Sequence, residues 1–287
     1  MIMRWLGGLA TKLGLTPSLQ TASLEQLFAA MEERARPCVR LIQAEADIPV
    51  STKLGGLPEM RGRYEWPYWK ERPLSFVAQI ELAEIKLASG ADWLPDEGRL
   101  FFFYDPEQEA WGCNPQDKGA WIVLYDASPD PASHLDAPSL LPEHGRFPER
   151  SMAAVAARSY PSPDRLRESV GVPADEDWDA AYERHRLPSP AHQLGGYPAA
   201  IQYDGMEREC QFASNGIYLG DGKGYETPQA LALEAGAEDW LLLLQVDSYN
   251  DESGMMWGDC GMLYFWIRRQ DVAGRDFSKV WMVLQCS

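Results

Sequence analysis

Two Gln-x-acid motifs, each at the end of an apolar segment, hold the residues best suited to chemistry. Gln79 and Glu81 form the first motif, and Gln245 and Asp247 form the second. Alternate residues of a strand lie on one face, so each amide shares a face with its carboxylate. Crowded carboxylates raise one another's pKa or require a cation, and they can act as an acid/base pair. The two motifs therefore predict a polar ligand site.

Two further aspartates extend this candidate site. Asp96 precedes the strand expected after Glu81, and Asp259 precedes the strand expected after Asp247. If each pair of strands forms a hairpin, its two acids meet at one end. The six residues are then expected to form one pocket for a small cationic ligand or a divalent cation, and this pocket could serve an enzyme. The structural alternative is that the glutamines bond to neighbouring backbone and the acids cap turns.

Three tryptophans and one histidine are candidates for a groove or a partner surface. Trp66, Trp69 and Trp257 fall in expected loops, and aromatic side chains are enriched at binding surfaces. His192 precedes a Gly-Gly turn, where it is either a hydrogen-bonded turn residue or a base. The sequence lacks a G-x-S-x-G motif, and its four histidines are not at metal-ligand spacing. We therefore predict no catalytic residue and no cofactor, which favours a protein that is not an enzyme.

Apolar segments and capping signals predict the elements that position these residues. Ser23 and Gln26 have the spacing of a capping box, and Thr227 followed by Pro228 is typical of a helix start. Helices are expected from Ser23 to Pro37, over 164–170 and 174–186, and from Thr227 onward. Strands are expected over 38–44, 74–82, 100–104, 121–125, 152–159, 241–246, 263–267 and 280–284, and at Ile201.

Matching motifs in the two halves of the chain predict an internal repeat. Leu-Gly-Gly-x-Pro stands at residues 54–58 and again at 194–198, and Asp-x-Gly-x-Leu stands at 96–100 and 259–263. We therefore expect an α+β fold, a β-rich internal duplication of two similar units with a few peripheral helices. The candidate pocket would lie at the interface of the repeats.

The same motifs suggest boundaries along the chain. The expected parts are an N-terminal helical segment (1–35), a first β-rich repeat (36–126), a proline-rich connection with short helices (127–191) and a second β-rich repeat (192–287). The two repeats are expected to form one compact domain.

Charge and cysteine usage restrict the partners and the compartment. The 287 residues include 26 Lys and Arg against 43 Asp and Glu, a net charge of −17, which disfavours nucleic acid and anionic membranes. Five cysteines without a C-x-x-C pair are typical of a reducing compartment. No export signal is recognised in residues 1–15, and no apolar run is long enough to span a membrane. These observations predict a cytoplasmic protein.

Several segments together resemble the YwqG-like family of unknown function. The segments are residues 54–58, 66–67, 73–80, 192–202, 241–248 and 257–261, and the resemblance extends over about residues 35–287. The family positions include Gln79, His192, Gln202, Gln245, Asp247, Trp257 and Asp259. The resemblance implies a cytoplasmic bacterial α+β fold with an internal duplication, and it assigns no chemistry to these residues. Members resemble proteins encoded near toxin and immunity loci, which implies a binding role.

These observations favour a binding protein whose acidic surface holds a basic protein partner, as an immunity-like factor does. The alternative is a protein with a small-ligand or divalent-cation pocket, which could be an enzyme. The sequence leaves the oligomeric state undecided.

Overall fold

One large antiparallel sheet dominates the structure, a computed structural model that describes residues 24–61, 64–170, 182, 183, 185–249, 251 and 254–287. In spatial order its ten strands are β14 (Trp281–Gln285), β13 (Met262–Arg268), β12 (Trp240–Asp247), β11 (His192–Leu194), β1 (Arg36–Gln43), β10 (Arg150–Ser159), β2 (Lys53–Leu54), β6 (Ser75–Glu81), β7 (Arg99–Tyr104) and β8 (Trp121–Asp126). Two small ladders join β3 (Glu59–Met60) to β9 (Ser133–His134) and β4 (Tyr68–Trp69) to β5 (Arg72–Pro73).

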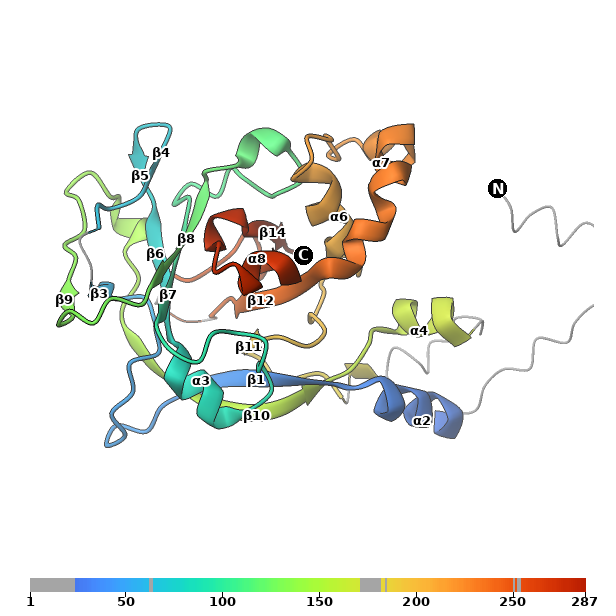
Figure 1. The fold of residues 1–287 in the computed structure, drawn as a ribbon, viewed down its shortest axis with the longest axis horizontal. Coiled ribbons are helices and arrows are strands. Elements are labelled where there is room, and N and C mark those ends of the chain that lie inside the picture. The colour runs from blue at the N-terminus through green and yellow to red at the C-terminus, as the bar shows by residue number, and fades with distance from the viewer. Residues whose placement is uncertain (1–23, 62–63, 171–181, 184, 250, 252–253) are drawn as a thin grey trace, which may run out of the picture.

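The long strands β1 and β10 lie at the centre of the sheet and join its two wings (Figure 1). β1 pairs with β10 along its whole length, from Arg36 opposite Ser159 to Gln43 opposite Met152. The other edge of β1 pairs with β11. The ten strands of the large sheet therefore belong to one continuous ladder.

The expected fold class, an α+β duplication of two similar units, is wrong. The structure is strand-rich, and its strands form one nearly closed, barrel-like sheet. The ladder crosses the expected boundaries, because β1 from the expected first unit pairs with β10 from the connection and with β11 from the second unit. Motif similarity reports local structure and not which strands pair, so the long-range pairing of β1 was not visible in it.

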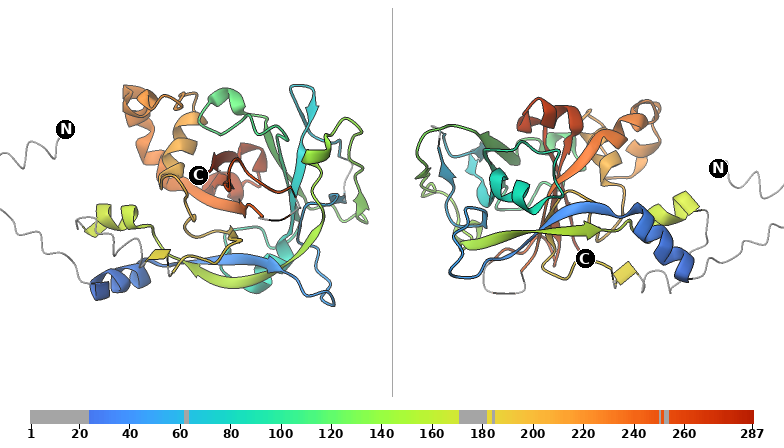
Figure 2. Two further views of the ribbon diagram at one scale, coloured as in Figure 1. Left: turned by 180° about the vertical axis from the view of Figure 1, so that it is seen from behind. Right: turned by 60° about the horizontal axis from the view of Figure 1, so that its bottom comes forward.

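The sheet curls until its two wings face each other across an aromatic core (Figure 2). The rings of Phe102 on β7 and Phe265 on β13 lie 5.0 Å apart, centroid to centroid. At the sheet edges the Trp121 and Trp281 rings lie 4.9 Å apart, and the Trp121 indole nitrogen donates to the Val280 carbonyl at 2.9 Å. Among the described strands, β8 and β14 share no ladder, so side chains and loops complete the barrel.

The strand residues are buried according to their position in the curled sheet. All six residues of β7 and all seven of β6 are buried, which explains why these apolar runs show no alternation with polar residues. Exposed residues interrupt the central strands β1 and β10, which reflects one solvent-facing side. The predicted strands thus form close to their expected bounds, with the exception of Ile201, which lies in a bend.

Helices lie around the sheet, and several begin where capping predicts. The helices are α2 (Leu24–Arg34), α3 (Leu82–Ala88), α4 (Pro163–Val170), α6 (Met206–Ala213), α7 (Pro228–Leu233) and α8 (Arg269–Ala273), with 3-10 turns η1 (Pro115–Asp117), η2 (Glu143–Gly145), η3 (Lys223–Glu226), η4 (Glu234–Asp239) and η5 (Phe277–Lys279). The Thr227 hydroxyl accepts from the Ala230 amide at the start of α7, as predicted. Most of the helix expected over 174–186 lies outside the described residues.

None of the helices in the described part of the chain has the length and apolar character that a membrane span needs.

A loop following β7 closes against the edge strand β14, and it needs a glycine there. The Leu284 amide donates to the Trp111 carbonyl at 3.1 Å, and the Trp281 indole nitrogen donates to the Gly112 carbonyl at 2.9 Å. Gly112 has φ +94°, and a Cβ placed on it would lie 2.0 Å from the Met282 carbonyl oxygen. Only glycine allows this approach of two backbones.

We expect Gly112→Ala to lower the free energy of unfolding by about 1–3 kcal/mol more than Gly216→Ala. Gly216 is the matched control, because its φ is +90° but a Cβ there would have nothing within 4 Å. Urea denaturation of the three proteins measures the difference. An equal decrease in the free energy of unfolding of the two variants would contradict the close contact of the Gly112 loop with β14.

Candidate functional site

The antiparallel ladder places the two Gln-x-acid motifs on strands β6 and β12, which four other strands separate. From β12 the ladder passes through β11, β1, β10 and β2 to β6, which makes five antiparallel steps. An odd number of reversals leaves β6 and β12 running in opposite directions. Glu81 and Asp247 are the last residues of these strands. The six predicted residues therefore do not meet in one pocket.

At the β6 end, the predicted residues make structural contacts. The Gln79 side chain accepts from the Glu59 amide at 2.8 Å and donates to the Ser51 carbonyl at 2.7 Å. The Glu81 carboxylate accepts from Arg99 at 2.8 Å. Asp96 is exposed and pairs with Lys86 on the surface at 2.8 Å. These contacts match the structural alternative given for the glutamines and leave Asp96 apart from Glu81.

At the β12 end, Gln245 is also structural, whereas Asp247 borders open space. The Gln245 side chain accepts from the Ala199 amide at 2.9 Å and donates to the Ala191 carbonyl at 2.5 Å. Asp259 is exposed, and its carbonyl accepts from the Ser287 amide at 3.1 Å. Asp247 lines a cavity of about 840 Å³.

The three candidate tryptophans are core residues and do not form a partner surface. Trp257 is 1% exposed, and its ring packs edge-on against Tyr104 and Phe147. Trp66 is buried, borders a smaller cleft of about 260 Å³ and donates to the Leu74 carbonyl at 2.8 Å. Trp69 is buried beneath the Lys70 ammonium group. Their segments lack regular structure or are short, but the barrel covers the rings.

His192 is fully buried beside Asp247 and acts as a hydrogen-bond acceptor. Its Nδ1 accepts from the Asp247 amide at 3.1 Å, so the neutral ring carries its proton on Nε2. Burial, with the nearby charges of Arg40 and Arg150, lowers the His192 pKa to about 3. The ring therefore stays neutral at physiological pH and holds the end of β12 against β11.

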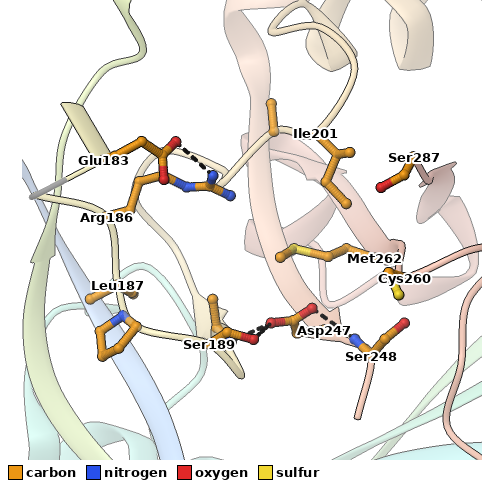
Figure 3. Close-up of a pocket in the computed structure, with 13 residues that line it drawn as sticks. Glu183, Arg186, Leu187, Ser189, Ile201, Asp247, Ser248, Cys260, Met262 and Ser287 are labelled. Atoms are coloured by element: carbon orange, nitrogen blue, oxygen red, sulfur yellow. Dashed lines mark hydrogen bonds and ion pairs between the residues drawn. The ribbon is translucent and has the colours of Figure 1, made fainter. Parts of the chain in front are cut away.

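Charged, polar and apolar residues together line the cavity beside Asp247 (Figure 3). Figure 3 shows the Asp247 carboxylate between Ser189 and Ser248, with Met262 and Cys260 on the far side. The lining also includes Leu187 and Ile201. Arg186 and Glu183 form an ion pair at 2.9 Å at the rim, so they neutralise each other. The volume is within the usual range for ligand pockets.

Three donors hold the Asp247 carboxylate in place. One oxygen, Oδ2, accepts from the Ser189 hydroxyl at 2.9 Å and from the Ala191 amide at 2.8 Å. The other, Oδ1, accepts from the Ser248 amide at 2.8 Å. A carboxylate can accept about four hydrogen bonds, so Asp247 retains the capacity for one more. A fixed and buried carboxylate with spare capacity can bind a cationic group strongly.

Sequence reasoning predicted Asp247 and missed the rest of the cavity wall. Ser189, Arg186 and Leu187 come from the proline-rich connection and carry no recognisable motif. Ile201 was assigned to a strand, and Met262 lay just before the strand expected over 263–267. No signal in the single sequence places these residues opposite Asp247. The described residues also contain no group of three or more His, Cys, Asp or Glu side chains suited to a metal ion.

Comparison with known families identifies the domain. The sequence profile of DUF1963, described as a domain of unknown function, matches residues 52–286. The chain belongs to the DUF1963 family. The DUF1963 match extends from β2 to β14 and includes the whole Asp247 cavity except Ser287. The central strand β1 precedes it. The chain has no significant match among curated proteins.

The buried His192 predicts acid sensitivity. Its folded-state pKa of about 3 is below the ordinary value of 6.5. As the pH falls below 6.5, the unfolded chain takes up a proton that the native ring does not accept. Stability from this group is therefore fully present above pH 6.5 and falls by up to about 1.4 kcal/mol per pH unit towards pH 3.

We expect His192→Asn to reduce this pH dependence, because Asn retains a nearby acceptor for the Asp247 amide but does not titrate. Urea denaturation of both proteins between about pH 7 and pH 5 measures the two slopes. His134→Asn, at an exposed histidine of β9, is the control. If the free energy of unfolding changed equally with pH in the wild type and in His192→Asn, the lowered pKa of His192 would be contradicted.

Proposed function

We propose that the protein is a binding protein whose Asp247 cavity receives a lysine or arginine side chain of a basic protein partner. The observation that carries this proposal is the buried, three-fold hydrogen-bonded carboxylate of Asp247 on the wall of an open cavity. The cationic group of the partner's lysine or arginine would occupy the remaining acceptor position of Asp247. Leu187, Ile201 and Met262 provide an apolar lining for the methylene stem of such a side chain.

The charge of the whole chain supports a basic partner. A net charge of −17 attracts cationic proteins over a distance set by the ionic strength. Such attraction raises the association rate, while a buried carboxylate contributes to the lifetime of the complex. The long-range attraction is therefore expected to respond to salt, and the contribution of the buried carboxylate is expected to respond to mutation of Asp247.

The resemblance to the YwqG-like family gives the proposal a biological setting. Its implied link to toxin and immunity loci favours an immunity-like factor in the cytoplasm, where the partner would be a basic toxin. The description of the DUF1963 family specifies neither a reaction nor a partner.

A small cationic ligand is the second candidate for the same cavity. Asp247 is only 4% exposed, and this buried position favours a small ligand. A small ligand reaches a deep carboxylate more easily than a flat protein surface can. This candidate concerns the Asp247 cavity alone, because Glu81 and Asp96 lie elsewhere.

Calorimetric titration with a lysine-rich peptide tests the proposal. We expect the wild type to bind the peptide at low salt and Asp247→Asn to bind it about tenfold or more weakly, since a hydrogen bond to a charged group is lost. Asp96→Asn removes the same charge from an exposed position and is the matched control. Ile201→Trp fills the cavity and leaves Asp247 in place, so it should also weaken binding. Thermal unfolding confirms that each variant is folded.

The outcomes separate the two candidates. Binding of spermidine or arginine without binding of the peptide would assign the cavity to a small ligand. Equal weakening by Asp247→Asn and Asp96→Asn would show that general acidity alone accounts for the attraction, and the proposal would fail.

A further inference from the structure

A second depression in the surface, separate from the Asp247 cavity, is walled by tryptophan. We call it the tryptophan groove and define it by Arg36, Trp93, Trp240, Trp266 and Arg269. Its narrow part has a volume of about 220 Å³. It opens into a wider part of about 590 Å³ that shares Arg36, Trp240 and Arg269 with it. The groove thus combines flat aromatic walls with guanidinium groups.

The two groove arginines carry charge that the protein itself does not neutralise. Within the described residues, neither Arg36 nor Arg269 has a carboxylate ion pair, and the Arg36 guanidinium lies 4.1 Å from the centre of the Tyr197 ring. The neighbouring carboxylates of Asp204 and Glu207 are already paired with Arg165. In a chain of net charge −17, two unpaired cations at one groove are selective for an anion.

Two neighbouring side chains, those of Arg208 and Trp240, have partners within the protein. Arg208 pairs with Glu234 at 2.6 Å, and the Trp240 indole nitrogen donates to the Gln211 side chain at 2.9 Å. Glu238 also borders the wide part, at the end away from the narrow pocket. Glu238 does not line the narrow end, and the one carboxylate that does, Glu207, is paired with Arg165. Arg36 and Arg269 therefore give the narrow end its preference for an anion.

The groove wall also contains a buried hydrogen-bond donor without an acceptor. Trp266 is 1% exposed, and its Nε1 has no hydrogen-bond partner in the described structure. Buried indole nitrogens usually find an acceptor, and leaving one unpaired costs free energy. A ligand oxygen at the narrow end would supply this acceptor.

A turn of two glycines forms part of the lining of the narrow end. Gly195 and Gly196 line it, with φ of +73° and +72°. A Cβ on Gly195 would point toward the Trp93 indole ring, 3.5 Å from its nitrogen. The turn therefore packs closely beside Trp93 and contributes backbone, without side chains, to the lining of the narrow end.

We propose that the tryptophan groove binds a small aromatic anion. The ring of the ligand lies against Trp93 and Trp240, and its carboxylate or phosphate group pairs with Arg36 and Arg269. An oxygen of the same ligand accepts from Trp266. This site is independent of the Asp247 cavity, which selects cations.

Calorimetric titration with matched probes tests the proposal on the full chain. Indole-3-acetate and phenyl phosphate are the two anionic probes, and indole-3-acetamide is the neutral counterpart of the first. We expect at least one anion to bind about tenfold or more tightly than the amide. The stronger of the two anions then identifies the carboxylate or the phosphate as the preferred group.

Three variants locate the binding. Arg269→Gln is expected to weaken the binding of the anion by about tenfold, and Trp266→Phe, which keeps a ring but removes the N–H, by a smaller factor. Arg275→Gln removes the same charge from an exposed residue outside the groove and should leave the affinity unchanged. Thermal unfolding checks that Trp266→Phe is folded, and Arg36→Gln serves if it is not.

Three results would overturn the proposal. The first is the absence of binding by both anions up to about 1 mM. The second is binding of the amide as tight as that of indole-3-acetate. The third is an equal effect of Arg269→Gln and Arg275→Gln on the affinity of the anion.

Discussion

The antiparallel ladder through all ten strands is the constraint on which the rest of the structure depends. Because β1 pairs with β10 on one edge and β11 on the other, the two wings cannot be placed independently. Four strands, β2, β10, β1 and β11, then stand between β6 and β12 in the sheet. This separates Glu81 from Asp247, and it leaves Asp247 beside residues of the proline-rich connection.

This arrangement places two candidate sites with side chains of opposite charge on an acidic protein. At the end of β12, backbone and hydroxyl donors fix a single carboxylate at a cavity. At the start of β1 and after β13, two arginines that have no carboxylate ion pair among the described residues stand beside tryptophan rings. The negative net charge agrees with a cation at the Asp247 cavity, but it gives no indication of an anion at the tryptophan groove. The local pairing of charges therefore matters more than their sum at each site.

The sequence predicted local structure well and long-range arrangement poorly. Apolar runs such as 100–104 and 263–267 are strands, because strong β-formers that must be buried leave few alternatives. The glutamines at 79 and 245 satisfy backbone groups, as buried amides usually do. Strand pairing and the burial of Trp257 depend on contacts between residues far apart in sequence, which periodicity does not report. For the same reason, Asp247 was predicted while Ser189 and Leu187 were missed.

Chemical-shift mapping of backbone amides during titration with a lysine-rich peptide tests the central claim most directly. The account predicts that the largest shifts occur at Ala191 and Ser248, whose amides donate to the Asp247 carboxylate. It also predicts little change at the Glu59 amide, which donates to Gln79 on β6, a strand that four others separate from β12. Shifts spread evenly over the acidic surface, or centred on Glu59, would contradict it.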